Sequence, residues 1–379
     1  MTHPALDERT RRVKAAATES GADWAVLSSA AAVAYATGYA VPSALRSSPF
    51  AGGPAIAIVG PDGRTAVVVP DVEAADVPAD RVDLVVEYPA FYAPGFPAAR
   101  GYARAVEETI ERLGASGPVG VEPATLPATL AEVLSRAGER RLDIGERLDD
   151  HRATKTHEEV VALRASARVA GAGQRAAAAS LAGGHTELDV LAAVRRAIER
   201  AARAPVELEL DLLSGRRTAH AMGAPTDRLI EAGDLVLIDL VPRVGCYWGD
   251  SCTTLAVGTV PPEVATLHVA AAEALDEARE ILRPGVTAGA VAERLRGMIE
   301  RAGFHDPIHL GHGIGTANVE HPRLQPGETT VLREGMVLMV EPCAVQPGLG
   351  GVRLERMFRL TATGSEDLSD HPYPAPLAT

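Results

Sequence analysis

The first part of the chain alternates short apolar segments with longer amphipathic ones. The apolar segments include WAVL at residues 24–27 and the pair AIAIV and TAVVV, which a turn at Asp62 and Gly63 separates. Apolar runs of this length are typical of β-strands, and two of them around Asp-Gly predict a hairpin. Residues 11–21 and 102–113 have helical spacing instead. The alternation predicts a small α/β domain.

A change in composition marks the end of this domain. From Thr156 the chain is rich in alanine, and the pattern predicts a helix that continues to Ala182 and ends at Gly183 and Gly184. A length of 379 residues suits at least two domains, at roughly 150 residues each. We therefore expect one domain at residues 1–150 and a second at residues 151–379.

The second part of the chain contains an internal repeat. Residues 184–201 match residues 285–302, and residues 231–239 match residues 333–341. Thr186 and Thr287 occupy equivalent positions in the two copies, and each is expected to cap a helix. Each copy then has an aliphatic segment of strand length that ends in a carboxylate. The repeat predicts two halves related by a pseudo-twofold axis.

Four carboxylates take matching places in this repeat. One acid ends the aliphatic strand and another lies on the returning strand: Asp239 and Asp250 in the first copy, Glu341 and Glu355 in the second. A pseudo-twofold axis would bring all four to one centre, where they would repel one another. Arg353 or Arg356 could pair with one or two of them. Divalent metal ions compensate better, and two ions held by carboxylates and an imidazole can activate a water.

Candidate imidazoles for such a centre lie between the helix and the strand of the second copy. They are His305, His309, His312 and His321. His312 stands out because it lies between glycines in G-H-G-I-G, where the backbone can come close to a metal or ligand.

Composition limits the partners of the protein. With 37 Lys and Arg against 50 Asp and Glu, the formal net charge is −13, which argues against nucleic acid and anionic membranes. No apolar run approaches the ~20 residues of a membrane helix, and the polar start lacks the apolar core of a signal peptide. Three cysteines are too few for a disulfide framework. We expect a cytoplasmic protein.

The spacing of these residues resembles that of the pita-bread metallohydrolases, which include methionine aminopeptidase, prolidase, Xaa-Pro aminopeptidase and creatinase. Five motif residues occur in order: Asp239 and Asp250 in D-x10-D, His312 in G-H-G-x-G, Glu341 in E-P and Glu355 in G-V-R-x-E. AVAYATGY resembles the creatinase-like N-terminal domain of the family, and S-G-R-R-T-A and P-T-D-R add similarity to the prolidase-like branch. The resemblance implies an α+β chain, with a creatinase-like α/β domain at residues 1–150 and a duplicated pita-bread domain at residues 151–379.

The resemblance also implies a role for each motif residue. Asp239 would chelate one metal ion, Asp250 and Glu355 would bridge two ions, and His312 and Glu341 would complete the second ion's shell. A bridging water would be the nucleophile and Glu341 the proton shuttle. Oxygen-rich ligation favours Mn or Co, with Zn or Fe as alternatives. A homodimer is implied as well.

The chain departs from the family at two auxiliary histidines. The family positions fall on Met222 and Val319, while histidines occur two residues away, at His220 and His321. Either His220 and His321 take over substrate contact and proton transfer, or the machinery specific for peptides is absent.

Three functions remain open on the sequence. The first is an Xaa-Pro peptidase that hydrolyses the bond before proline in a small peptide. The second is a small-molecule enzyme on the same metal cage, either a C–N hydrolase like creatinase and ectoine hydrolase or a lyase. The third is a binding module without catalysis, which the five ligands argue against.

Other residues near the motifs have less specific interpretations. Cys246, Cys252 and Cys343 lie close to the proposed ligands in sequence, but their spacing favours small buried apolar side chains over zinc ligands. Arg46 and Tyr92 are either gating residues for substrate or exposed loop residues.

Overall fold

The computed structural model divides into two compact units, Met1–Arg152 and Ala153–Thr379. It describes the chain except for residues 1–3, 43–51, 91–97, 182–183 and 374. Arg46 and Tyr92 therefore lie outside the described residues.

The N-terminal unit is built on a six-stranded sheet with the order β4-β3-β2-β1-β5-β6. Its strands are β1 (Trp24–Leu27), β2 (Ile56–Val59), β3 (Thr65–Pro70), β4 (Leu84–Tyr88), β5 (Val119–Val121) and β6 (Arg141–Asp143). The hairpin predicted around Asp62 and Gly63 is confirmed, because β2 pairs antiparallel with β3 across that turn. Three further pairs are parallel: β3 pairs with β4, β1 with β5, and β5 with β6.

Helices cover both faces of this sheet. They are α1 (Pro4–Glu19), α2 (Ala30–Thr37), α3 (Ala98–Leu113), α4 (Ala128–Arg136) and α5 (Gly145–Ala153), with a 3₁₀ helix at Asp71–Asp76. α1 and α2 pack with one apolar cluster of the sheet, and α3 and α4 pack with the other. Because both faces are covered, the strands β1, β2 and β3 are buried along their whole length instead of alternating.

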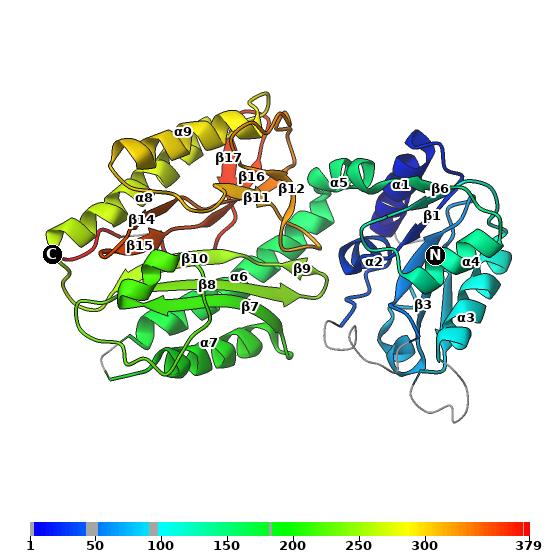
Figure 1. Cartoon of the computed structure of the whole chain (residues 1–379), viewed down its shortest axis with the longest axis horizontal. Coiled ribbons are helices and arrows are strands. Elements are labelled where there is room, and N and C mark those ends of the chain that lie inside the picture. Colours follow the sequence, from blue (N-terminus) through cyan, green and yellow to red (C-terminus); the bar gives the residue numbers. More distant parts are fainter. Residues whose placement is uncertain (1–3, 43–51, 91–97, 182–183, 374) are drawn as a thin grey trace. The chain divides into compact units, whose positions relative to one another are not determined.

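The second unit shows the expected duplication. Its first half contains α6 (His157–Ala179), α7 (Glu187–Ala202), β7 (Glu207–Ser214), β8 (Leu235–Val244), β9 (Tyr247–Trp248) and β10 (Ser251–Ala256). Its second half contains α8 (Pro262–Ile281), α9 (Ala288–Arg301), β11 (Gly311–Gly313), β12 (Glu320–Arg323), β13 (Val337–Val340), β14 (Cys343–Gln346), β15 (Gly350–Arg353), β16 (Arg356–Leu360) and β17 (Ser365–Asp367). In Figure 1 the helices α7 and α9 lie on opposite sides of the strands.

Local contacts repeat between the two halves. Thr186 accepts a hydrogen bond from the backbone N–H of Asp189, and Thr287 accepts one from Ala290, so both predicted helix caps are confirmed. Thr186 and Thr287 also form equivalent isolated bridges, to Leu229 and Val331. The starts of α7 and α9 thus have the same cap and the same kind of bridge, which supports a duplicated unit.

The helix predicted from Thr156 to Ala182 is shorter than expected. Thr156 caps it in a reciprocal arrangement with Glu159, but the helix ends at Ala179. The Ser180 hydroxyl donates to the Ala176 carbonyl there, which satisfies a backbone group at the helix end.

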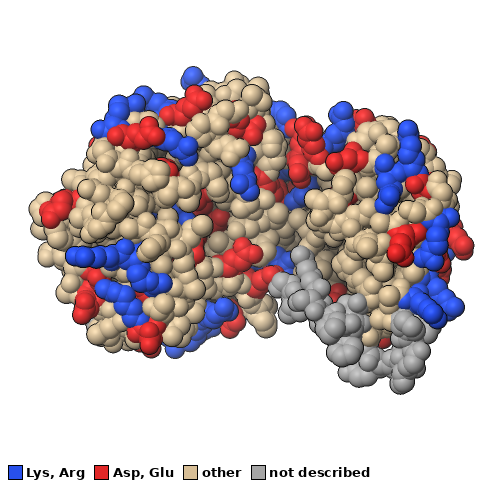
Figure 2. All heavy atoms as spheres, in the orientation of Figure 1, with Lys and Arg blue, Asp and Glu red and all other residues tan. Residues whose placement is uncertain are grey.

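Charge is mixed on the surface, and no membrane span is found. No helix in the described part of the chain combines the length and the apolar character needed to cross a membrane. On the face shown in Figure 2, acidic and basic side chains are interspersed over each unit.

The C-terminal residues of the second unit carry a buried histidine. His371 is 4% exposed, and its Nε2 atom has no hydrogen-bond partner. Burial and the nearby Arg356 guanidinium lower the pKa of His371 to about 4, although Asp367, Asp370 and a backbone contact with Glu355 oppose the shift.

We expect His371 to make the protein acid-sensitive. Its folded-state pKa lies below the unfolded value of about 6.5, so stability is lost as the pH falls from 6.5 to 4, by up to ~3 kcal/mol. His371→Gln should lessen the loss of unfolding free energy between pH 7 and pH 4.5, measured by urea denaturation. The exposed His305→Gln is the control. Equal losses in His371→Gln and the unaltered protein would contradict the assignment.

Candidate metal centre

Five residues predicted as metal ligands come from both halves of the second unit. Two of them lie within strands, Asp239 in β8 and His312 in β11, and three lie beside strands: Asp250 before β10, Glu341 after β13 and Glu355 between β15 and β16. β8 pairs antiparallel with β10 and β13 with β16, so each strand pair has one acid in or next to each of its strands.

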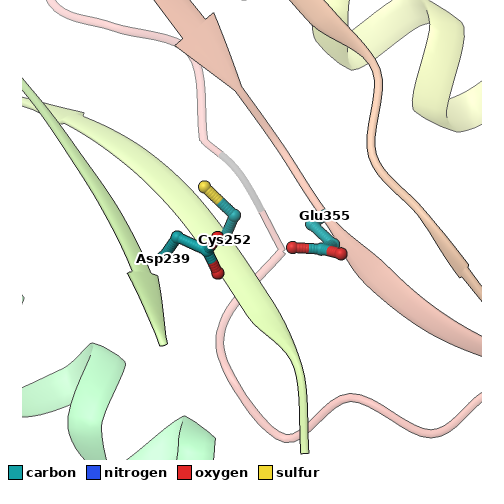
Figure 3. A group of neighbouring side chains, drawn as sticks. All are labelled: Asp239, Cys252 and Glu355. Carbon is teal, nitrogen blue, oxygen red and sulfur yellow. The ribbon is translucent and has the colours of Figure 1, made fainter. Parts of the chain in front are cut away.

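The structure brings these side chains together. Donor atoms of Asp250, His312 and Glu355 lie within 4.8 Å of one another. Donor atoms of Asp239 and Glu355 form a second group of the same size with the Cys252 sulfur, which Figure 3 shows. Glu341 lies next to the first group, because the Nε2 atom of His312 is 3.5 Å from Glu341 Oε1 and 3.5 Å from Asp250 Oδ2.

The carboxylates of this cluster lack enough protein partners. The atoms Asp239 Oδ1, Asp250 Oδ1 and Glu355 Oε1 are buried without a hydrogen bond. Burial raises the pKa of Asp239 and of Glu355 well above their ordinary values, and the neighbouring carboxylates raise both further. Buried acceptors that face one another without donors are the arrangement expected of cation ligands. The residues present therefore fit a divalent metal centre.

His312 is oriented by the backbone around it. Its Nδ1 lies 2.8 Å from the Gly313 carbonyl oxygen, so Nδ1 is the donor and Nε2 of the neutral ring carries the lone pair toward the carboxylates. Burial opposes protonation, but Asp250 and Glu341 outweigh it and raise the pKa of His312 to about 9 in the metal-free protein. A side chain at Gly311 would lie 2.0 Å from the Met339 carbonyl, which explains the glycine before His312.

His309 is a member of the site that the motifs did not single out among four candidate histidines. Its Nδ1 lies 3.0 Å from Glu341 Oε1, and its ring contacts that of His312 edge-on, with 5.4 Å between centroids. Burial opposes ionisation of Glu341, but His309 and His312 outweigh it and lower its pKa. The short spacing of three residues between His309 and His312 was the available signal.

Arg353 is the cation that pairs with the cluster. It is 2% exposed and forms ion pairs with Asp239 and, at 3.3 Å, with Asp211. The expectation that Arg356 could pair with these acids is wrong, because Arg356 binds Asp367. Neighbouring residues in an extended chain point to opposite sides, so Arg356 faces away from the side that Glu355 occupies. No motif or repeat position singled out Asp211.

Neither auxiliary histidine belongs to the two donor groups. His220 is exposed at the end of a 3₁₀ helix, Gly215–His220, and the Nε2 atom of His321 lies 3.0 Å from the Thr330 hydroxyl. Met222 is 59% exposed and Val319 is 38% exposed. The roles of His220 and His321 in substrate contact and proton transfer stay predictions.

The three cysteines are all buried, as expected. Ala221, which follows His220, packs against Cys343 and Val345 in β14. The loop that carries His220 and Met222 therefore lies against the strand that begins two residues after Glu341.

A duplicated domain with a buried cluster of carboxylates and one imidazole defines a metal-dependent hydrolase of the pita-bread class. Comparison with known proteins gives the family. Residues 161–362 match the model of metallopeptidase family M24, and residues 9–154 match the creatinase/prolidase N-terminal domain. The chain belongs to metallopeptidase family M24, whose members depend on divalent metal ions, and the predicted fold class is confirmed.

Individual relatives agree with this family. The chain is 31% identical over 258 residues to a putative dipeptidase of Bacillus subtilis, covering 67% of this chain and 71% of that protein. It is 29% identical over 267 residues to the Xaa-Pro dipeptidase of Pyrococcus horikoshii, covering 70% and 76%. The solved structure of prolidase from Pyrococcus furiosus superimposes with a TM-score of 0.77 at 27% identity, over 94% of this chain and 98% of that one.

Proposed function

We propose that this protein is an Xaa-Pro dipeptidase-like hydrolase that uses two divalent metal ions to cleave the bond before proline. The ligands would be Asp239, Asp250, His312, Glu341 and Glu355. The observation that carries the proposal is the set of buried carboxylate oxygens without hydrogen-bond partners, gathered around the Nε2 atom of His312.

The charge of the cluster supports two ions over one. Arg353 pairs with both Asp239 and Asp211, so the four proposed ligand acids, Asp211 and the guanidinium together leave four negative charges when all are ionised, which is the charge of two divalent ions. Uncompensated buried charges are costly, so the site gains from a second ion. Carboxylate-rich ligation favours Mn or Co, while Zn or Fe would also fit an imidazole-containing set.

Two of the proposed ligands, Asp239 and Glu341, are oriented by protein contacts. Arg353 occupies Asp239 Oδ2, which leaves Oδ1 for a metal ion. Glu341 Oε1 lies 3.0 Å from His309 Nδ1, and the His309 side chain is 27% exposed, so His309 would be the group that passes a proton between Glu341 and solvent. When bound, the ions would polarise the scissile carbonyl and lower the pKa of a water.

The relatives support this substrate class. A relative that is similar over 76% of its own length is an Xaa-Pro dipeptidase, and a prolidase is among the structural neighbours. No contact among the described residues favours a small-molecule C–N hydrolase, a lyase or a binding module over a peptidase. From the resemblance we also propose a homodimer in the cytoplasm.

Removal of a bridging ligand should remove the metal. Asp250→Ala is expected to weaken binding of Mn²⁺ or Co²⁺ by about 100-fold or more and to abolish activity, because it deletes one of the buried acceptors. Elemental analysis of the purified variant tests this directly. The exposed Asp227→Ala serves as a matched control and should retain metal. Full metal content in Asp250→Ala would rule out the bridging role.

The substrate can be tested with matched dipeptides. The metal-loaded protein should hydrolyse Xaa-Pro dipeptides, such as Ala-Pro and Met-Pro, and leave Ala-Ala and Met-Ala intact. Removing the metal with a chelator should stop the reaction, and adding Mn²⁺ or Co²⁺ should restore it. If the loaded protein ignores every Xaa-Pro peptide but turns over a small amidine, urea-like or onium compound, the small-molecule alternative replaces the peptidase.

A further inference from the structure

Three side chains form a row across the first-half sheet beside the candidate metal centre. Asp239 in the central strand β8 is directly opposite Asp211 in β7 on one side and Cys252 in β10 on the other. Arg353, from β15, contacts all three members of this row. The arginine therefore fixes the row from a strand of the other half of the unit.

The row needs this cation. Two carboxylates directly opposite each other on paired strands repel, and here the guanidinium of Arg353 binds both Asp211 and Asp239. Asp211 also accepts the backbone N–H of Gly223 at 2.8 Å, so its own position is fixed. The orientation of the Asp239 carboxylate thus depends on where the guanidinium is held.

Cys252 holds Arg353 at two points. The Nε atom of Arg353 donates to the Cys252 sulfur at 3.3 Å, and the thiol donates to the Arg353 carbonyl oxygen at 3.6 Å. Thr254, two residues on in the same strand, exchanges hydrogen bonds with the backbone N–H and carbonyl of Arg353, at 3.0 and 3.1 Å. The strand β10 therefore fixes the main chain of Arg353, and Cys252 alone within it also fixes the side chain.

Direct ligation by the thiol is the competing explanation. The sulfur lies within 4.8 Å of donor atoms of Asp239 and Glu355, and Figure 3 shows the three side chains converging. However, both hydrogen-bonding capacities of the thiol are used by Arg353, whereas Asp239 Oδ1 and Glu355 Oε1 have no partner. The contacts therefore favour a thiol that hydrogen-bonds to Arg353 over a thiol that binds a metal ion.

We propose that Cys252 is a positioning residue of the metal centre: its thiol fixes the Arg353 guanidinium against Asp239 and thereby sets metal affinity, without binding the metal itself. This rests on the proposed metal-dependent function. Partners of this kind, which orient a metal ligand from outside, change metal affinity by about 10- to 100-fold when they are lost.

Substituting Cys252 by alanine and by serine distinguishes the effect of losing the thiol's hydrogen bonds from the effect of losing its volume. Both are smaller than cysteine by a similar amount, but only serine can donate to the Arg353 carbonyl and accept from its Nε atom. In calorimetric titrations of the metal-free protein with Mn²⁺ and Co²⁺, Cys252→Ala should bind about tenfold more weakly, and Cys252→Ser should bind within about threefold of the unaltered protein. Cys246→Ala, a buried cysteine outside the row, should bind normally.

Other outcomes overturn the proposal in distinguishable ways. Equal affinity in Cys252→Ala and the unaltered protein refutes positioning, and so does an equal loss in the alanine and serine variants. A sulfur-to-cobalt charge-transfer absorption in the Co²⁺-loaded protein that disappears in Cys252→Ser would make the thiol a ligand instead. If Cys252→Ala does not fold, Cys252→Val, which fills the space without hydrogen bonds, takes its place. Failure of the unaltered protein to bind either ion would refute the proposed function itself.

Discussion

The mutual repulsion of four neighbouring carboxylates, three of them buried and Asp239 half-buried, is the constraint on which the second unit depends. Asp250, Glu341 and Glu355 are 5% exposed or less, and burial in such company costs free energy unless positive charge is present. The protein supplies one fixed cation, Arg353, together with the imidazoles of His309 and His312. These groups do not balance the negative charge of the carboxylates. Bound metal ions would supply the remaining positive charge.

Duplication is what makes this arrangement attainable. Each half presents an acid on an aliphatic strand and another on the strand that returns, and neither half alone gathers enough ligands. The halves also exchange support, because Arg353 of the second half fixes Asp239 of the first, and the backbone N–H of Glu355 donates to the Cys252 carbonyl. Metal binding would therefore tie the two halves together, so the site and the packing of the unit stabilise each other.

The convergence of the five proposed ligands could be predicted from the sequence, whereas the contacts that hold them could not. Strand ends, the repeat and the glycines around His312 are local patterns, so Asp239, Asp250, His312, Glu341 and Glu355 could be found without coordinates. The row of Asp211, Asp239 and Cys252 depends on the register of three strands, and the contact between His309 and Glu341 depends on side-chain direction. Neither is encoded within a short segment, and the difference between Arg353 and Arg356 likewise required the strand geometry.

This chain keeps the family's five motif residues but departs from the family at the two auxiliary positions. All five motif residues are in place and converge, whereas the two auxiliary positions carry Met222 and Val319, both exposed. The loop of Met222 is nonetheless fixed on both sides, since Ala221 packs on Cys343 and Gly223 donates to Asp211. These two contacts hold the backbone on either side of Met222 in place. The five proposed ligands stay together, so any difference in substrate contact between this chain and its relatives would lie at the two exposed auxiliary positions and not in the metal centre.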